Sequence, residues 1–445
     1  MLYYLFNYLN QQNFPGAGVF NYVTFRAAVA IIIALIVSVW FGNWFIKLMK
    51  RKQIFETERD EKTDPFGAAK KATPTLGGVI IIVSILVPVL LICKLHSVYT
   101  LLMIATTLIL GALGFTDDYI KTFVKEEYID ENGEKKLRPK KDGLKKGYKL
   151  AGQILLGLIV GLTLRFSPAV QINEKVELKI EDNKEVVIKS PDVKSTRTTI
   201  PFVKSHDLNY ADLFKWAGPK WMYNLAWVFL VLLTIFIVAA VSNGSNLNDG
   251  MDGLASGDSA IIGLTLLILA YISSNAVTAS HLNLMYIPGS EELVVFLAAF
   301  VGALIGFLWY NSFPAQIFMG DTGSLTIGGL IAVSAIIMHK ELLLPLLCGV
   351  FLFEIISDFD VTLFLKNGKK HRFWKCAPLH NHFRYTYDEI HEKYPNTRIT
   401  FKGIGQFLDT LPDEMKKVKE VKITIRFWII TILLAAFTLI TFKIR

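Results

Sequence analysis

The sequence predicts an all-α polytopic membrane protein with about ten transmembrane helices. Apolar stretches of about 18 to 25 residues recur along the chain, and a helix needs about 20 residues to cross a bilayer. Of the 445 residues, 52% are hydrophobic and 19% are charged, whereas soluble domains carry about 25% charged residues. The Lys and Arg residues gather between the apolar stretches, which favours a chain that crosses the membrane repeatedly.

The expected spans lie at residues 20–45, 75–95, 97–115, 147–164, 222–241, 257–274, 293–310, 325–338, 342–365 and 425–442. The first apolar stretch is long and is followed by Arg51 and Lys52, so we expect a retained helix and no cleavable signal peptide. The whole chain, residues 1–445, is expected to form one integral membrane domain.

Basic residues set the expected orientation. Eight Lys or Arg residues lie in 47–71, ten in 117–149 and thirteen in 366–422, so the positive-inside rule assigns these segments to the cytoplasm. Residues 166–222 hold nine basic and eight acidic residues, and 275–292 hold no Lys or Arg, which fits the outer side. Ten spans then leave both termini on the outer, periplasmic side.

The outer insertion at residues 166–222 has a strand-like pattern. Val176, Leu178 and Ile180 alternate with charged residues, and a turn signal follows at residues 182–183. We expect a small β-hairpin on the outer surface, with no chemistry of its own.

The cytoplasmic segment at residues 366–424 is polar and contains Pro378 and Pro395, which predicts short helices and loops beside the membrane. It includes a Pro-x-His-x-His stretch with His380 and His382. Two histidines at this spacing could bind a metal or a phosphate, or could be surface residues.

Aspartates near the ends of apolar stretches are the strongest functional signal. Asp117 and Asp118 end the third span. Asp249 and Asp252 follow the fifth span, and Asp321 follows the seventh. Charged groups at such positions are costly and mark functional sites by default. The orientation, which was set by Lys and Arg alone, assigns all three groups to the cytoplasmic face. Helix capping explains one such cluster more readily than three at one face.

Three acidic groups at one face predict a site for a hard cation. Oxygen ligands suit Mg²⁺, which binds through one or two carboxylates plus substrate phosphates. If Asp249 and Asp252 start a helix, their spacing puts both on one face. Asp117 and Asp118 diverge by about 100° on a helix, so we expect them to have different roles.

A site that handles phosphates also needs cations. Lys70 precedes the second span, and Lys121, Lys125 and Lys149 lie in and around the loop that follows the third. The second span opens with Thr-Pro-Thr-Leu-Gly-Gly at residues 73–78. Its glycine pair indicates either close approach of a ligand to the backbone or close packing of helices.

Five motifs occur in order along the chain: Thr-Pro-Thr-x-Gly-Gly, Asp-Asp, Asn-Leu-x-Asp-Gly-x-Asp-Gly, Phe-Met-Gly-Asp-x-Gly-Ser and Pro-x-His-x-His. Together they resemble the phospho-N-acetylmuramoyl-pentapeptide transferases, within the polyprenyl-phosphate N-acetylhexosamine-1-phosphate transferases. The resemblance covers nearly the whole chain, and the combination is much more specific than any one motif.

The resemblance implies an enzyme of the bacterial cytoplasmic membrane. It would transfer phospho-N-acetylmuramoyl-pentapeptide from UDP-N-acetylmuramoyl-pentapeptide to undecaprenyl phosphate, giving lipid I and UMP, in the first membrane step of peptidoglycan synthesis. Mg²⁺ would be required. The resemblance further implies a homodimer surrounded by membrane lipid, with no nucleic acid as partner.

The resemblance also implies roles for residues. Asp321 would ligate Mg²⁺, Asp117 would act as a base toward the lipid phosphate with Asp118 beside it, and His380 would complete the catalytic set. The implied substrate-binding residues are Lys70, Thr75, Lys121, Lys125, Lys149, Asn243, Asn246, Asp249, Asp252, Phe318 and His382, with Phe318 stacked on the uracil.

The chain departs from the family pattern at several positions. Asn381 stands inside a usual His-His-His stretch, and Arg384 replaces an acidic residue. Asp358 and Asp360 lie where the family tends to have an apolar run, and Asn248 replaces a more common Thr. A role that needs an imidazole at Asn381 is therefore not expected here.

The sequence leaves two routes and several functions open. Asp117 could act as a base in a single displacement, or an aspartate could attack and form a phospho-enzyme. A sister enzyme that transfers N-acetylglucosamine-1-phosphate is the nearest alternative function. A secondary transporter is disfavoured because the acids lie at one face and not at the midplane, and a non-catalytic scaffold is the third class. Because the acceptor is a lipid and the nucleotide is water-soluble, we expect a groove at the membrane edge.

Overall fold

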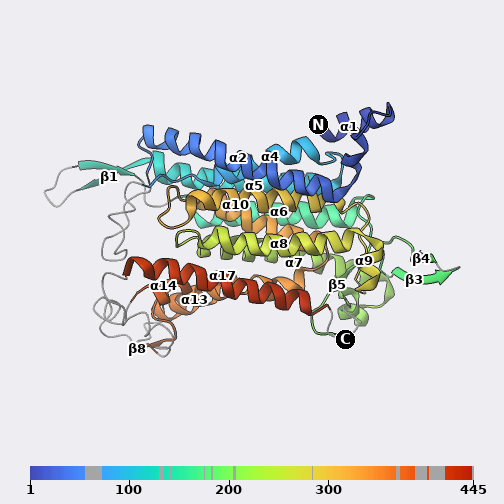
Figure 1. Cartoon of the computed structure of the whole chain (residues 1–445). Helices are drawn as coiled ribbons and strands as arrows, with labels where there is room; N and C mark the ends of the chain where they lie inside the picture. Colours follow the sequence, from blue (N-terminus) through green and yellow to red (C-terminus); the bar gives the residue numbers. More distant parts are fainter. Residues whose placement is uncertain are drawn as a thin grey trace.

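The computed structural model describes residues 1–55, 73–129, 135–139, 143–174, 176–181, 184–203, 207–282, 284–366, 371–385, 398–399 and 416–442. Within these residues, eight helices are long and apolar enough to cross a membrane: α2 (Val23–Arg51), α5 (Val98–Phe123), α6 (Lys146–Phe166), α7 (Pro219–Asn248), α8 (Leu254–Ser274), α10 (Glu291–Asn311), α11 (Gly320–Ile337) and α17 (Lys416–Ile440). They run side by side as an elongated bundle (Figure 1). The predicted helical membrane class is confirmed.

Two further predicted spans are helical but are not simple crossings. α4 (Gly78–Ile92) has 15 residues, which makes it about 22 Å long, whereas the hydrocarbon core is about 30 Å thick. The segment predicted at 342–365 is broken, because η3 (Glu341–Leu343) and α12 (Leu344–Leu347) meet α13 (Gly349–Lys366) at an angle of 76°. All ten predicted segments are thus helical, and eight of them are single helices long enough to cross.

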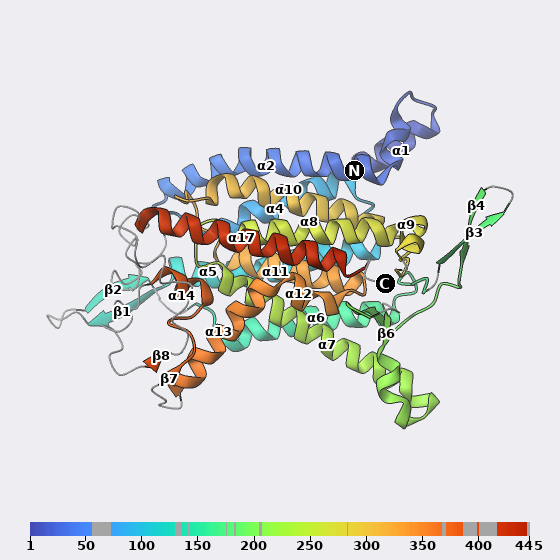
Figure 2. The same cartoon turned by 60° about the horizontal axis from the view of Figure 1, so that its bottom comes forward.

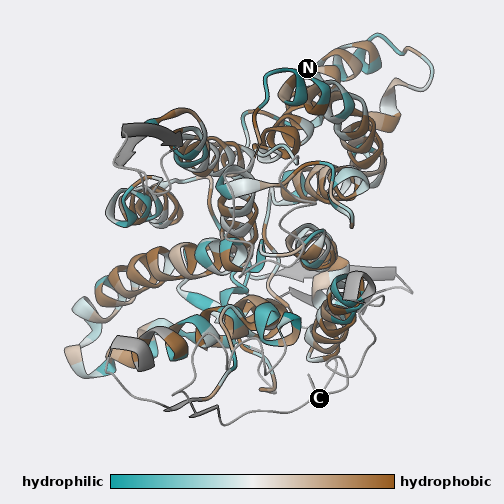
Figure 3. Ribbon diagram, turned by 90° about the vertical axis from the view of Figure 1, so that its left-hand side faces the viewer, coloured by the Kyte–Doolittle hydropathy of each residue, from teal (hydrophilic) through white to brown (hydrophobic). Residues whose placement is uncertain are grey.

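α11 lies inside the bundle and contacts α4, α5, α7 and α8. Figure 2 shows it in the interior, with α2 and α7 at opposite edges. In its apolar 18-residue window 89% of the residues are buried, whereas the corresponding share for α2 is 22%. Hydrophobic residues dominate these helices when the bundle is viewed from one end (Figure 3). The small residues of α11 allow its neighbours to approach closely, as is common between membrane helices.

Close backbone packing fixes the beginning of α11. A Cβ atom at Gly78 would lie 2.1 Å from the backbone nitrogen of Gly323, and one at Gly114 would lie 2.2 Å from the carbonyl oxygen of Asp321. The backbone N–H of Gly78 also donates to the carbonyl of Met319 at 2.8 Å. Of the two interpretations of the Gly-Gly pair, helix packing is therefore the one that the structure supports.

One end of the bundle, here called the β3–β4 end, carries the described parts of the insertion at residues 166–222. β3 (Val176–Glu181) and β4 (Lys184–Lys189) pair antiparallel, which confirms the predicted hairpin. The same end carries β5 (Arg197–Thr199), β6 (Asp207–Asn209), η2 (Tyr210–Ala217), α9 (Ala276–His281), α1 (Leu2–Gln11) and η1 (Ala17–Asn21). Figures 1 and 2 show that α17 ends there too, so the beginning and the end of the chain lie at one end of the bundle.

The opposite end, here called the β1–β2 end, carries β1 (Lys125–Ile129) and β2 (Lys135–Pro139), which form an antiparallel pair. It also carries α14 (Leu379–Arg384) and the short parallel pair of β7 (His371–Arg372) and β8 (Arg398–Ile399). The described residues between α13 and α17 thus form a short helix and loops, as predicted, and two short strands that were not predicted.

Candidate active site

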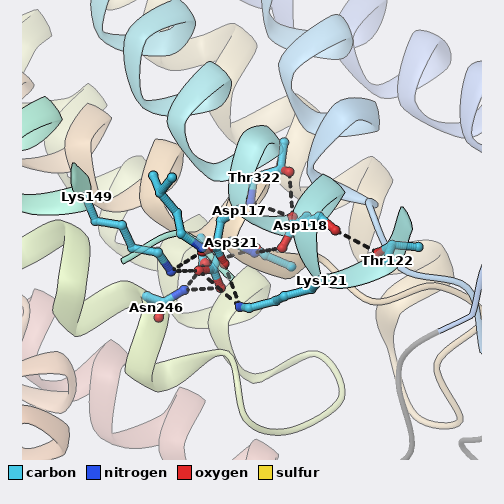
Figure 4. A network of polar contacts seen from close by, with 11 residues as sticks. Asp117, Asp118, Lys121, Thr122, Lys149, Asn246, Asp321 and Thr322 are labelled. Atoms are coloured by element: carbon cyan, nitrogen blue, oxygen red, sulfur yellow. Dashed lines mark hydrogen bonds and ion pairs between the residues drawn. The ribbon is translucent and has the colours of Figure 1, made fainter. Parts of the chain in front are cut away.

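Four helices bring polar side chains together at the β1–β2 end. Asp117 and Asp118 lie on α5, Asp321 lies in the first turn of α11, Asn246 lies near the end of α7, and Lys149 lies in the first turn of α6. Figure 4 shows these side chains pointing toward one another. Segments that are far apart in the sequence therefore build one cluster. This agrees with the expectation that these aspartates lie at the same face.

Asp118 is bound to the beginning of α11. Its carboxylate accepts hydrogen bonds from the backbone N–H of Asp321 at 3.0 Å and of Thr322 at 2.9 Å, and from the Thr322 hydroxyl at 2.6 Å. The first N–H groups of a helix have no partner inside the helix, so a carboxylate there is stabilising. Gly320 has a φ of +71°, and a Cβ there would lie 2.5 Å from Asp118 Oδ2, so this position requires glycine.

Asp117 has a different set of partners, as predicted for its neighbouring position on the helix. It is buried, pairs with Lys121 Nζ at 2.6 Å and Lys149 Nζ at 2.9 Å, and accepts a hydrogen bond from the Leu144 backbone N–H at 2.6 Å. Lys149 also forms an ion pair with Asp321, and Lys121 lies 3.5 Å from it. Two lysines thus bridge Asp117 and Asp321 (Figure 4).

Asp117 and Asp118 lie just beyond the predicted third span, but they do not end the helix. The apolar stretch ends near Phe115, but α5 continues to Phe123. The helix extends beyond the apolar stretch because it gains polar partners there, among them the i, i+4 ion pair between Asp117 and Lys121. Hydrophobicity marks where a helix leaves the membrane and not where its backbone hydrogen bonds end.

The carboxylates of Asp117, Asp118 and Asp321 suit a hard divalent cation. One oxygen of each lies within 4.8 Å of the others. Three oxygen donors without sulfur or imidazole favour Mg²⁺ among biological cations. Asp118 already accepts three hydrogen bonds from α11, whereas Asp117 and Asp321 share two lysine partners that a cation could displace, so these two are the better candidates for ligands.

A cavity of about 270 Å³ lies beside these carboxylates. Eight of the predicted site residues line it: Thr75, Asp118, Lys121, Asn246, Asp249, Asp252, Phe318 and Asp321. One aromatic ring therefore shares a wall with carboxylates, an amide and an ammonium group. This combination suits a ligand that has both a flat base and phosphates.

The two asparagines on α7 are placed differently. Asn246 Nδ2 donates to Asp321 Oδ1 and to Ser324 Oγ, each at 2.9 Å, so it orients the carboxylate of Asp321. Asn243 is exposed, and its amide donates to Gln153 Oε1 at 3.2 Å. Asn243 therefore joins α7 to α6, one turn away from the cavity.

Asp249 and Asp252 lie in the turn between α7 and α8, so the condition under which they would share one helix face is not met. α7 ends at Asn248, and Gly253, with a φ of +74°, precedes the first residue of α8. Glycine adopts this left-handed conformation readily and so favours a break between the helices. Asp252 Oδ2 accepts a hydrogen bond from the Ala315 N–H at 3.0 Å, which ties the turn to the segment before α11.

With this geometry established, the chain was compared with known proteins. The glycosyl transferase family 4 profile matches residues 100–339. The phospho-N-acetylmuramoyl-pentapeptide-transferase of Bacteroides fragilis is 55% identical over 450 residues, which cover 100% of both chains. Proteins of the same name from Phocaeicola vulgatus and Porphyromonas gingivalis are 55% and 48% identical, again over 100% of both chains.

The chain belongs to the phospho-N-acetylmuramoyl-pentapeptide-transferase family.

In this member of the transferase family, the Pro-x-His-x-His stretch forms α14 behind the cavity. His380 is buried, and its Nδ1 lies 3.2 Å from Oε1 of Glu354 on α13, which also accepts the His380 backbone N–H at 3.2 Å. A Cβ at Gly250 would lie 2.0 Å from His380 Nε2, so the imidazole abuts the turn that lines the cavity. His380 can therefore act on the cavity through this turn.

His382 is buried in the same loop and has a different set of partners. Its Nδ1 accepts a hydrogen bond from the Lys375 backbone N–H at 3.0 Å, and its ring packs edge-on against Trp374. Burial, together with the charge of Lys375, lowers the pKa of His382 to about 4. The ring is thus neutral at pH 7 and accepts at Nδ1, which shapes the loop around it.

Two predicted residues of the transferase site lie apart from the cavity or beyond the described residues. Lys70 lies outside the part of the chain that the structure describes. Lys125 is the first residue of β1, and its side chain is exposed. Lys125 is not among the residues that line the cavity.

Sequence reasoning missed Glu354 and Asp258, two buried acids of the transferase bundle. Asp258 on α8 accepts hydrogen bonds from Asn248 Nδ2 at 3.0 Å and from the Thr431 hydroxyl at 2.7 Å, which joins α7, α8 and α17. The signal was present, because both acids fall inside predicted spans, where charge is costly. The network also gives Asn248 a structural role.

Proposed function

We propose that this chain transfers phospho-N-acetylmuramoyl-pentapeptide from UDP-N-acetylmuramoyl-pentapeptide to undecaprenyl phosphate, giving lipid I and UMP. This reaction is the first membrane step of peptidoglycan synthesis. The observation that carries the proposal is the cluster of Asp117, Asp118 and Asp321 with Lys121 and Lys149 beside a cavity at one end of an apolar bundle. Relatives of that name match the chain from end to end.

The position of the cluster suits the two substrates. The acceptor has its phosphate at the level of the lipid headgroups and its tail in hydrocarbon, whereas the nucleotide comes from water. The carboxylates lie where α5, α7 and α11 leave the apolar part of the bundle. A reaction centre at this level is accessible to both substrates, and we expect its cavity to open laterally toward lipid.

Mg²⁺ is the proposed cofactor, with Asp321 as its ligand and Asp117 within reach. When bound, the ion offsets the charge of the pyrophosphate and stabilises the departing UMP. Lys121 and Lys149 already bridge Asp117 and Asp321. When the substrate binds, we expect the ammonium groups of Lys121 and Lys149 to leave one of these carboxylates and to contact phosphate oxygens of the substrate. The negative charge of the phosphates is then neutralised.

The proposed reaction is a single displacement. An oxygen of undecaprenyl phosphate attacks the phosphorus that carries the sugar, a new P–O bond forms, and the bond from that phosphorus to the oxygen of UMP breaks. UMP leaves with the electron pair. Any proton on the acceptor phosphate, whose second pKa is about 6, passes to the carboxylate of Asp117.

The other residues are assigned by their positions around the cavity. Phe318 stacks on the uracil, while Thr75, Asn246, Asp249 and Asp252 bind the nucleotide and its pyrophosphate. We also propose substrate-binding roles for Lys70, Lys125, Lys149, Asn243 and His382, and a catalytic role for His380 exerted through the turn at Gly250.

The alternative route through a phospho-enzyme is less favoured by the geometry. The carboxylate of Asp118 accepts three hydrogen bonds from the start of α11, so attack by it would break these contacts. Asp117 is similarly engaged by two lysines and the Leu144 N–H. Incubation with UDP-N-acetylmuramoyl-pentapeptide alone tests this route, because a stoichiometric burst of UMP without lipid would contradict single displacement.

We further propose a homodimer in the bacterial cytoplasmic membrane, with ten crossings and both termini periplasmic. The excess of Lys and Arg near the β1–β2 end supports this orientation. Cysteines introduced at exposed Lys125 and exposed Leu213 test it. In intact cells a membrane-impermeant maleimide should label position 213 and leave position 125 unmodified. Mass photometry in detergent tests the dimer.

The decisive experiment measures UMP release by the detergent-purified chain with both substrates, with and without Mg²⁺, beside Asp321→Asn. We expect UMP only when lipid and Mg²⁺ are both present, and a loss of at least about a hundredfold in the variant. Consumption of UDP-N-acetylglucosamine in place of the muramoyl-pentapeptide nucleotide would assign the chain to the sister activity. Full activity in the folded variant would overturn the site assignment.

A further inference from the structure

A second cavity, of about 390 Å³, lies at the β3–β4 end, opposite the aspartates. Its wall is formed by α1, the connection between α4 and α5, and the first residues of α5 and α10, and its lining residues include Tyr3, Tyr4, Lys94, Tyr99 and Glu291. This volume far exceeds the roughly 10–15 Å³ that a single water molecule needs. Neither the proposed transfer reaction nor its substrates involve this end of the bundle.

One carboxylate in the wall is already neutralised. Glu292 is buried and receives both contacts of the Arg26 guanidinium, at 2.7 and 2.9 Å, together with the Lys94 backbone N–H at 2.8 Å. Lys94 Nζ lies 3.7 Å from the same carboxylate but remains 43% exposed. Arg26 and Glu292 therefore form a closed pair, and Lys94 keeps the capacity to bind an anion.

Two residues that line the cavity have polar groups without partners. Tyr99 is 2% exposed, and within the described residues its hydroxyl has no hydrogen-bond partner. Glu291, in the first turn of α10, forms no ion pair or hydrogen bond through its side chain with any residue that the structure describes. A buried hydroxyl without a partner is destabilising, so a ligand that bonds to it would be stabilised.

Aromatic rings complete the wall. The Tyr4 ring packs edge-on against the His96 ring with centroids 5.7 Å apart, and the Tyr4 hydroxyl is held by the Leu95 N–H at 2.9 Å. The Met1 ammonium donates to two backbone carbonyls at the end of α4, which keeps α1 against the bundle. Aromatic faces beside a carboxylate are a favourable environment for an ammonium group.

The position of the cavity along the bundle indicates which kind of ligand can reach it. It lies where α4 ends and where α5 and α10 begin, so it is level with lipid headgroups if these helices span a membrane. α1 and α2 form an outer edge of the bundle (Figure 2). A headgroup could therefore enter from the surrounding bilayer.

We propose that this cavity binds the zwitterionic headgroup of an aminophospholipid, with its primary ammonium at Glu291 and the Tyr99 hydroxyl and its phosphate at Lys94. Both charges of the headgroup then meet the opposite charge. An anionic lipid without an amine leaves Glu291 unpaired, and a free amine leaves Lys94 without an anion. Soluble phosphoethanolamine shares the headgroup's chemistry, so the test distinguishes it from the lipid.

The test is native mass spectrometry of the delipidated full-length chain, titrated with phosphatidylethanolamine, with phosphatidylglycerol of the same acyl chains, and with soluble phosphoethanolamine. We expect phosphatidylethanolamine to bind about tenfold more tightly than phosphatidylglycerol, since one charge-assisted hydrogen bond supplies such a difference. Equal affinities for the two lipids would overturn the proposal. If soluble phosphoethanolamine binds as tightly as the lipid, the ligand of this cavity is a soluble compound and the proposal of a lipid is wrong.

Two variants locate the binding. Glu291→Gln and Tyr99→Phe should each reduce the preference for phosphatidylethanolamine at least several-fold, and Tyr99→Phe keeps the ring in place in case the first variant does not fold. Asp212→Asn is the matched control, since Asp212 is an acid in η2 at the same end that pairs with Lys215 at 3.1 Å. An unchanged preference in both cavity variants, or a loss of it in the control, would contradict the assigned site.

Discussion

Asp118 and Thr322 are separated by 204 residues, yet the carboxylate of Asp118 accepts both the backbone N–H of Thr322 at 2.9 Å and its hydroxyl at 2.6 Å. This double contact fixes the start of α11 on α5. Because Asp321 is the preceding residue, the same contact sets the position of the carboxylate that we assign to Mg²⁺. Asp118 is thus a positioning residue.

Asp118→Asn should reduce activity strongly and destabilise the protein by about 1–3 kcal/mol, because an amide cannot accept hydrogen bonds through its NH₂ group. Thr322→Val removes the hydroxyl donor alone and should have a smaller effect. Thermal unfolding and UMP release of the two single variants and the double variant measure the coupling. Strictly additive effects would contradict the proposed contact.

Lys149→Gln should lower kcat/KM for UMP release by about 10²–10³-fold, the usual effect of removing one electrostatic contact from a reaction centre. Lys149 contacts both Asp117 and Asp321. Lys52→Gln is the comparison, since Lys52 is exposed at the end of α2 and has no assigned role, and we expect less than about a tenfold effect there, the range of a single surface charge. Equal losses in the two variants would show that the cluster has no special role.

Glu354→Gln should weaken the orientation of His380, because Glu354 accepts the backbone N–H of His380 and lies 3.2 Å from its Nδ1. The expected result is a lower kcat with a smaller change in KM for the nucleotide, since His380 reaches the cavity through the turn at Gly250. Glu354→Asp keeps the charge and should restore part of the activity. If Glu354→Gln lowers the thermal stability but the folded fraction keeps the kcat of the unaltered chain, Glu354 has a structural role alone.

Gly114→Ala should destabilise the protein by about 1–3 kcal/mol through overpacking. Its Cβ would lie 2.2 Å from the carbonyl oxygen of Asp321 and would push α5 away from α11. Gly147→Ala in α6 is the matched control, because a Cβ there meets nothing within 4 Å. Thermal unfolding in detergent should show a lower transition temperature for the first variant and no decrease for the second.

The loop that contains α14 should lose stability as the pH falls. Burial lowers the pKa of His382 to about 4 in the folded chain, whereas an exposed histidine has a pKa of about 6.5. The unfolded loop therefore binds a proton more readily, so the contribution of His382 is complete above pH 6.5 and is lost as the pH falls toward 4.

Hydrogen exchange of residues 375–385, corrected for the intrinsic rate, measures this pH dependence. Protection should decrease between pH 7 and pH 5 in the native chain. In His382→Gln, which does not titrate, the same interval should change protection much less. A decrease of equal size in both proteins would attribute the effect to another group.

Much of the fold could be predicted because a helix that crosses a membrane requires a continuous apolar stretch, which is visible in the sequence. Each apolar stretch became a helix, and the alternation at Val176, Leu178 and Ile180 became strand β3. The boundaries were less accurate, as at α5, because polar side chains that pair outside the apolar region extend a helix. The short α4 and the bend between α12 and α13 were not predicted, since a break inside an apolar run leaves its mean hydropathy almost unchanged.

The sequence by itself determined the membrane class, the family and most of the residues around the cavity, because hydrophobicity, charge and motifs are properties of short segments. Only the tertiary structure decided which of these residues meet: that Asp118 holds the start of α11, that Lys121 and Lys149 bridge Asp117 to Asp321, and that Glu354 holds His380. The physical reason is that the partner of a buried polar group is set by how helices pack. That packing brings together residues as many as 204 positions apart, and no local pattern records it.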